Sequence, residues 1–120
     1  MSYPTYTNFV TEDFSHINKK RSDEWQNGNV WDAMDWAAAM SGEAGEAIGF
    51  GKKIRRMDDG MVQAQVGQTR EELLVEYGKE LADVVIYADL AATHAGIDLW
   101  DVIKSKFNET SERNGFKERI

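Results

Sequence analysis

The residues of this chain with the clearest chemical potential are two pairs of acids, each pair separated by three positions. Glu43 and Glu46 form the first pair, and Glu80 and Asp83 form the second. Residues three apart on an α-helix share one face, so each pair would present two carboxylates side by side. Carboxylate oxygens are the ligands that Mg²⁺ and other hard divalent cations take. The spacing therefore predicts a metal site built from these acids.

Two long helices must carry these pairs, and the sequence predicts four helices and no strands. The single proline, Pro4, leaves every later segment free of the strongest helix breaker. Thr69, with a glutamate three residues on, has the form of a capping box, and Asp98 is a second capping residue. The expected helices span about residues 6–26, 30–56, 70–95 and 99–113, and the polar connection 57–68 is a candidate substrate lid.

The helical positions of the acids indicate that they face the protein interior. Glu43 falls within the apolar stripe of its helix, and Glu80 lies on a helix that is apolar nearly all round. Burying unpaired carboxylates is costly, and the lysines near the same faces, Lys53 and Lys79, are too few to neutralise the two pairs. Divalent cations would supply the missing positive charge.

The motifs Glu43-Ala-Gly-Glu46 and Glu80-Leu-Ala-Asp83 together resemble the ExxE…ExxD signature of the MazG-like, all-α nucleoside triphosphate pyrophosphohydrolases. The resemblance covers nearly the whole chain. It implies an all-α, four-helix MazG-like bundle over residues 1–120 as a single domain, in a homodimer or a dimer-of-dimers tetramer. The implied reaction is hydrolysis of a (deoxy)nucleoside triphosphate to the monophosphate and pyrophosphate. The four acids would hold two or more Mg²⁺ ions, which Mn²⁺ could replace.

The resemblance also implies roles in catalysis and substrate binding. Many members carry an extra acid at the position of Gly42, so a general-base role for that acid has no carrier here. On the chemistry of the residues themselves, Glu43 or Glu46 could orient the attacking water as general base. The chain's own pattern adds Lys53 as a candidate phosphate contact. The substrate is expected to be a purine deoxynucleotide such as dGTP, in control of the nucleotide pool. The implied substrate contacts are His16, Trp25, Tyr87, Lys104 and Asn108.

Two other classes of protein fit parts of the pattern. A four-helix di-iron carboxylate protein normally needs two Glu-x-x-His motifs, and neither His16 nor His94 has a glutamate three residues before it. A non-catalytic helical interaction module would use the same helices without turning over nucleotide. Metal content and nucleotide turnover distinguish these alternatives from the hydrolase.

Composition restricts the setting in which the protein acts. The chain has 120 residues, a net charge of −7 and no cysteine. Its length fits one domain, and its acidity argues against nucleic acid or an anionic membrane as partner. The lack of cysteine excludes disulfides and thiolate metal sites and fits a reducing cytoplasm. With no signal-like start, we expect a cytoplasmic protein, bacterial or in a phage's host.

Overall fold

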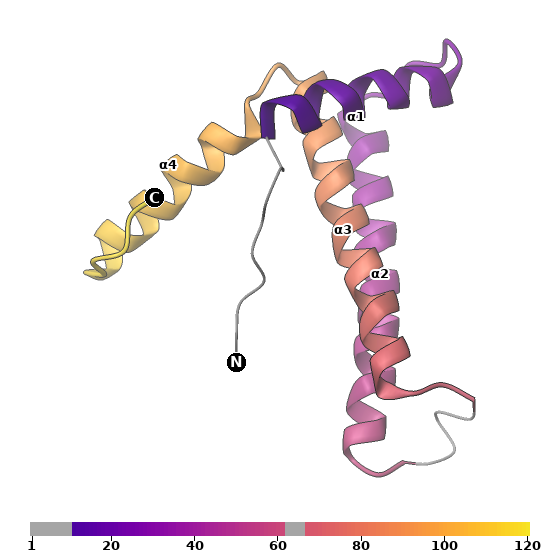
Figure 1. Cartoon of the computed structure of the whole chain (residues 1–120). Helices are drawn as coiled ribbons and strands as arrows, with labels where there is room; N and C mark the ends of the chain where they lie inside the picture. Colours follow the sequence, from indigo (N-terminus) through magenta and orange to yellow (C-terminus); the bar gives the residue numbers. More distant parts are fainter. Residues whose placement is uncertain (1–10, 62–66) are drawn as a thin grey trace.

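The computed structural model describes residues 11–61 and 67–120, most of which are helical (Figure 1). No strand occurs within these two ranges, so the expected all-α class is confirmed. The expected start of the first helix at residue 6, and residues 62–66 of the expected lid, lie outside the described residues. The helices are α1 (Thr11–Gln26), α2 (Ala33–Asp58), α3 (Arg70–His94) and α4 (Leu99–Asn114).

The ends of α3 and α4 are fixed by the residues that the sequence indicates. The Thr69 hydroxyl accepts a hydrogen bond from the Glu72 N–H, and the Glu72 carboxylate accepts one from the Thr69 N–H. Asp98 caps α4 by accepting from the two N–H groups that follow Leu99. Gly115 ends α4 in the left-handed conformation, with φ of 74°, which glycine adopts without a steric penalty.

The start of α2 differs from the sequence prediction by three residues. Asp32 is the N-cap, and its side chain accepts from the Asp35 N–H at 3.0 Å. The Asp35 carboxylate in turn accepts from the Asp32 N–H at 3.0 Å. This reciprocal pair stabilises a helix start at Ala33, where aspartate replaces the usual glutamate of a capping box.

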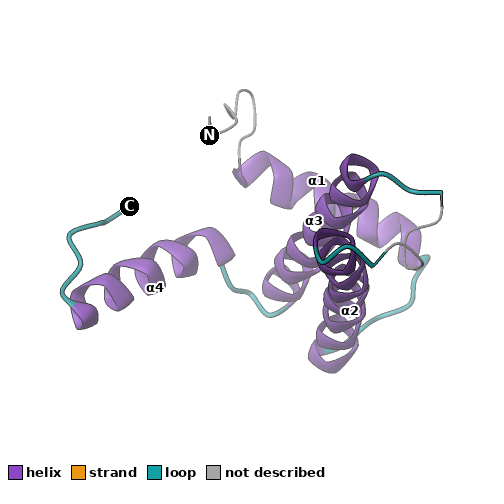
Figure 2. Ribbon diagram, turned by 90° about the horizontal axis from the view of Figure 1, so that it is seen from below, coloured by secondary structure: helices purple, strands orange, loops and turns teal. Residues whose placement is uncertain are grey.

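Helices α2 and α3 form a long hairpin, and α1 and α4 extend from one end of it. Helices α2 and α3 lie side by side and run in opposite directions, and α1 crosses one end of the pair (Figures 1 and 2). Helix α4 leaves from the same end and projects away from the hairpin, so the four helices do not close into a bundle within one chain. The radius of gyration is 17.7 Å, whereas a compact chain of this length has about 14 Å.

Several buried residues lie near the end of the hairpin that α1 crosses. Trp36 is 1% exposed there. Its ring centroid lies 4.7 Å from that of Trp31 and 4.8 Å from that of His94, on which it stacks. This aromatic cluster holds the start of α2 against the end of α3. It thereby fixes how the two helices align, and so sets Glu43 and Glu46 of α2 opposite Glu80 of α3.

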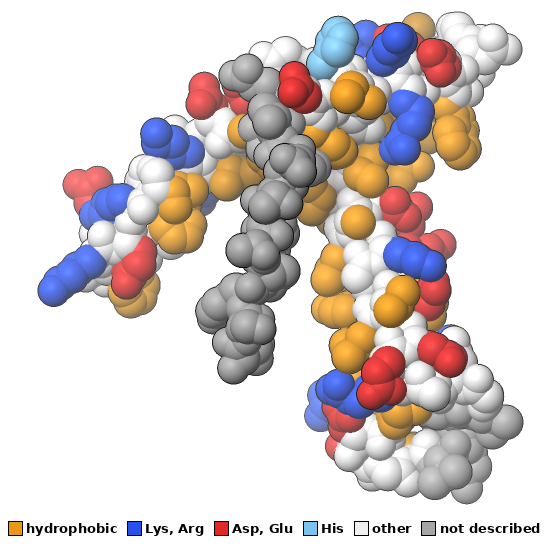
Figure 3. Space-filling model, viewed as in Figure 1, with side chains coloured by type: hydrophobic (Ala, Val, Ile, Leu, Met, Phe, Trp, Pro, Cys, Tyr) orange, Lys and Arg blue, Asp and Glu red, His pale blue; other side chains and the backbone are white. Residues whose placement is uncertain are grey.

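Much apolar surface stays open to solvent in the single chain. Hydrophobic side chains gather along the hairpin and along α4 in the space-filling view (Figure 3). No helix in the described part of the chain is long and apolar enough to cross a membrane. Exposed apolar residues on α3 and α4 include Leu74, Leu81, Val85, Ile103 and Phe107.

Candidate metal centre

Three of the four predicted acids come together where α2 and α3 lie side by side. Carboxylate oxygens of Glu43, Glu46 and Glu80 lie within 4.8 Å of one another. Glu43 and Glu80 are half-buried, while Glu46 is exposed. Glu43 and Glu46 share a face of α2 because they are three residues apart, and the antiparallel packing of α3 brings Glu80 to that face. These three residues are called the acid cluster below.

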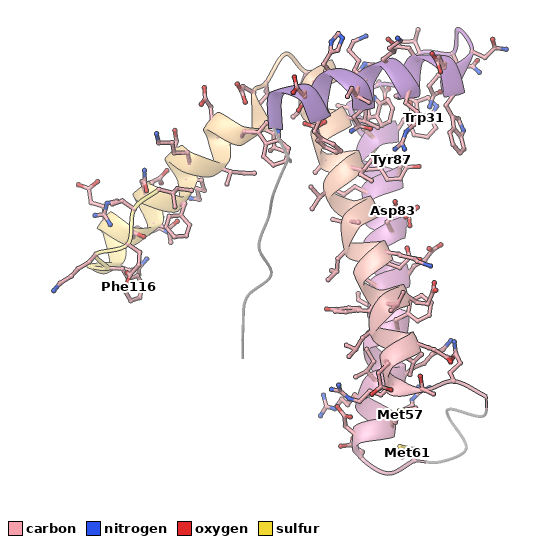
Figure 4. All side chains as sticks on the ribbon, in the orientation of Figure 1. Trp31, Met57, Met61, Asp83, Tyr87 and Phe116 are labelled. Atoms are coloured by element: carbon pink, nitrogen blue, oxygen red, sulfur yellow. The ribbon has the colours of Figure 1, made fainter. Side chains whose placement is uncertain are left out.

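Asp83, the fourth predicted acid, lies one turn after Glu80 and outside the acid cluster. It is half-buried, and it lines a cavity together with Glu43. Figure 4 shows Asp83 on the hairpin, on the α1 side of its middle, followed by Tyr87 and then Trp31 toward α1. The structure therefore places Asp83 beside the cluster, in the wall of the adjoining cavity.

The surroundings of Glu80 favour its protonated form. The pKa of Glu80 is raised to about 7, mainly by its hydrogen bond with the Glu43 carboxyl group and next by burial. A hydrogen bond with Glu46 and the negative charges of both neighbours raise it further. No cation is among the groups that shift this pKa, and the buried Glu80 Oε2 has no hydrogen-bond partner in the described part of the chain.

These properties fit a hard divalent cation. A cation bound among the three carboxylates would favour the ionised form of Glu80 and give its unpaired Oε2 a partner. Oxygen-only donors suit Mg²⁺ or Mn²⁺ better than softer metals. The cluster contains no histidine, and His94 instead stacks on Trp36, so the donor set differs from that of a di-iron bundle.

A cavity of about 730 Å³ adjoins the acid cluster between α1, α2 and α3. Its volume is in the range that holds small-molecule ligands. Aromatic rings in its wall offer faces on which a nucleobase can stack. Glu43 belongs both to this wall and to the acid cluster, so a ligand in the cavity would reach the cluster. The lining includes Trp25, Trp31, Tyr87, Asn18, Glu43 and Asp83.

Of the predicted substrate contacts, the structure brings Trp25 and Tyr87 to this cavity. Trp25 is 83% exposed at the end of α1, as expected of a residue with a free stacking face. His16 is exposed on α1 and is not in the cavity wall. Lys53 lies over the Phe50 ring, with its Nζ 5.1 Å from the centroid, in a separate depression of the hairpin.

The two predicted contacts on α4 are not near the acid cluster of their own chain. Lys104 is exposed on the helix that projects away from the hairpin. The Asn108 side chain is engaged by the chain end, since its Nδ2 donates to the Ile120 carbonyl at 3.0 Å and its Oδ1 accepts from the Ile120 N–H at 2.9 Å. Within one chain, neither residue meets a ligand bound at the cluster.

Sequence reasoning missed three residues around the cavity. Trp31 is assigned to the core by its type, yet it also lines the cavity. Asn18 is buried in the cavity wall, and nothing in its sequence context separates it from the other polar residues of α1. Asp89, which binds Asn18, is 2% exposed. A lone acid in the most apolar stretch of α3 is a signal that could have indicated a buried role.

Comparisons of the chain with protein-family models, with curated proteins and with solved structures find no match. The interpretation of the site therefore rests on its own chemistry: clustered carboxylates, a raised pKa at Glu80 and an aromatic cavity next to them.

Proposed function

We propose that this protein hydrolyses a (deoxy)nucleoside triphosphate to the monophosphate and pyrophosphate in a Mg²⁺-dependent reaction. The observation that carries the proposal is the convergence of Glu43, Glu46 and Glu80 beside a cavity whose wall contains three aromatic rings. The ExxE…ExxD resemblance supports the same reaction. A purine deoxynucleotide such as dGTP is the favoured substrate, in control of the cytoplasmic nucleotide pool.

Different residues of the chain would bind the substrate and transfer the proton. The rings of Trp25 and Tyr87 would hold the base, while Glu43 and Asp83, which also line the cavity, would lie at the phosphate end of the bound nucleotide. A bound Mg²⁺ would supply charge neutralisation on the phosphates and a lower pKa for the attacking water. Glu46 is the more exposed of the two candidate bases, so it is the better placed to pass a proton to solvent.

The open shape of the chain supports a homodimer or a dimer-of-dimers tetramer as the working form. A radius of gyration of 17.7 Å and exposed Leu81, Val85 and Phe107 leave apolar surface that a second copy would cover. Helix α4 carries Lys104 and Asn108 away from the acids of its own chain. In such an assembly, these residues would contribute to the site of another copy.

The proposal is tested by supplying the common ribo- and deoxynucleoside triphosphates, with dUTP, together with Mg²⁺ or Mn²⁺. Chromatography should show monophosphate and pyrophosphate in equal amounts for at least one substrate. Release of orthophosphate, or no turnover together with unchanged thermal stability on adding metal, would contradict the proposal and favour an interaction module. Bound iron with a visible absorption band would favour the di-iron alternative.

A further inference from the structure

A chain of hydrogen bonds fixes the orientation of one amide in the cavity wall. The Trp100 indole Nε1–H donates to the Ser15 Oγ at 2.8 Å, and the Ser15 hydroxyl donates to the Asp89 Oδ1 at 2.6 Å. An indole N–H only donates, so Ser15 must accept at one side and direct its hydrogen to Asp89. Asp89 is 2% exposed and uses its carboxylate as acceptor throughout.

Asn18 lies at the end of this chain and can adopt only one amide orientation. Its Nδ2 donates to the Asp89 Oδ2 at 3.0 Å and to the Ile86 carbonyl at 3.1 Å. A flipped amide would turn its oxygen toward two acceptors, which is repulsive. Both N–H groups of Asn18 are therefore committed to α3, and only Oδ1 remains for a ligand.

The free oxygen is an unusual feature of the cavity wall. Asn18 is 3% exposed, and its Oδ1 is buried without a hydrogen-bond partner among the described residues. An unpaired buried acceptor is unfavourable, and a ligand that donates an N–H to it removes that cost. The oxygen is shielded from water, so a base would reach it only after side chains of the cavity wall move.

We infer that Asn18 selects nucleotides whose base carries an exocyclic amino group over those with a carbonyl oxygen at the same position. This inference rests on the proposed nucleotide function. An amino group donates to Oδ1, whereas a carbonyl there would oppose a second acceptor and leave both unpaired. Asn18 is the specificity-determining residue, and Asp89 is a positioning residue that acts through it.

The inference is tested on pairs of monophosphates that differ at a single position. These are dCMP with dUMP, dAMP with dIMP, and dGMP with deoxyxanthosine monophosphate, in each of which a carbonyl replaces the amino group, and their dissociation constants are measured calorimetrically in the presence of Mg²⁺. Monophosphates are not hydrolysed, so selectivity is measured independently of turnover. The expected result is a preference of about tenfold or more for the amino member of at least one pair. Equal affinities within every pair, no binding, or a preference for the oxo member would overturn the inference.

Two variants separate selectivity from folding. Asn18→Ala should bring the amino-to-oxo ratio close to one. Asp89→Asn should lower or invert the ratio, because the new amide can donate to Oδ1 and let Asn18 turn its Nδ2 toward the ligand. The control, Asn114→Ala on α4, should keep the wild-type ratio. If Asn18→Ala fails to fold by circular dichroism, an unchanged ratio in folded Asp89→Asn still contradicts the mechanism.

The same measurements distinguish this inference from the proposed function. Selective binding without pyrophosphate release from the triphosphates would overturn the hydrolase and leave Asn18 as a selectivity residue of a binding site. Release of pyrophosphate without any amino-to-oxo selectivity would keep the hydrolase and overturn the role of Asn18.

Discussion

At Glu80, a proton and the proposed metal ion would compete for the same carboxylate oxygens. The pKa of this group is raised from 4.5 to about 7 by Glu43, by burial and by Glu46. The metal-free folded state thus binds this proton more tightly than the unfolded chain does. Its contribution to stability is complete below about pH 4.5 and is lost as the pH rises through about 7.

The expected consequence is a fall in the melting temperature of the metal-free protein between these pH values. Excess Mg²⁺ should abolish most of the fall, because the cation binds the ionised cluster and releases a proton. Glu80→Gln should lose the pH dependence that Glu80 contributes, which the difference between wild-type and variant melting curves in EDTA isolates. Parallel curves for the two proteins would show that Glu80 holds no raised pKa.

The buried carboxylate of Asp89 lies outside the acid cluster and contributes to the stability of the fold. It accepts hydrogen bonds from Ser15 and Asn18, and so ties α1 to α3. Asp89→Ala leaves these donors buried without a partner, and we expect a loss of about 1–3 kcal/mol or more in the free energy of unfolding. Urea denaturation measures the loss. Glu24→Ala, at an exposed position of α1, should change the free energy by about 0.5 kcal/mol or less.

At the scale of the elements, the sequence predicts the helices well because their ends depend on local chemistry. Thr69, Asp98 and Gly115 act through groups within four residues of themselves, so their roles can be recognised without tertiary information. The sequence predicts the start of α2 three residues too early, because the Asp32–Asp35 pair lacks the usual glutamate of a capping box. The direction of α4 depends on Trp100 and Ser15, which are 85 positions apart, and no local pattern predicts it.

The capping box of α2 should contribute to the free energy of unfolding. This helix carries two members of the acid cluster. Asp32→Ala removes the acceptor for the Asp35 N–H, and we expect the free energy of unfolding to fall by about 1 kcal/mol. Asp32→Ser keeps an acceptor at the N-cap and should stay close to the wild type. Equal destabilisation by both variants in chemical denaturation would mean that the side-chain bond is not the cause.

The site was only partly predictable for a related reason. Helical periodicity places Glu43, Glu46 and Glu80 on inward faces, and the hairpin brings them together. Periodicity does not say which partner helix lies opposite, so Asn18 and Trp31 could not be assigned to the cavity. The predicted contacts that a single chain does not bring to the cavity are His16, Lys104 and Asn108, which the resemblance implies, and Lys53, which comes from the chain's own pattern.

At the scale of the whole molecule, the main feature is apolar surface without a partner. Leu81 and Val85 lie on α3, one of the two helices of the hairpin, with exposed fractions of 45% and 47%. In a stable protein such surface is normally covered by association. The proposed dimer or tetramer would cover it and would also bring α4 of one copy within reach of another.

Light scattering coupled to size exclusion should give the mass of a dimer or tetramer at micromolar concentration. Leu81→Glu should weaken association by about tenfold or more, because it places a charge in an apolar contact. Val30→Glu, at a position that is 90% exposed in the turn before α2, serves as the control and should keep the wild-type mass. A wild-type monomer at these concentrations would contradict the proposed assembly.

The most direct test of the central claim is the Mg²⁺ dependence of pyrophosphate release by wild-type protein, Glu80→Gln and Glu71→Gln. The control, Glu71, lies on α3 and is exposed, outside the acid cluster. If Glu43, Glu46 and Glu80 hold the catalytic cation, Glu80→Gln should release pyrophosphate roughly 100-fold more slowly or worse, with helicity intact, while Glu71→Gln matches the wild type. Near-wild-type release by a folded Glu80→Gln would show that the acid cluster is not the metal site.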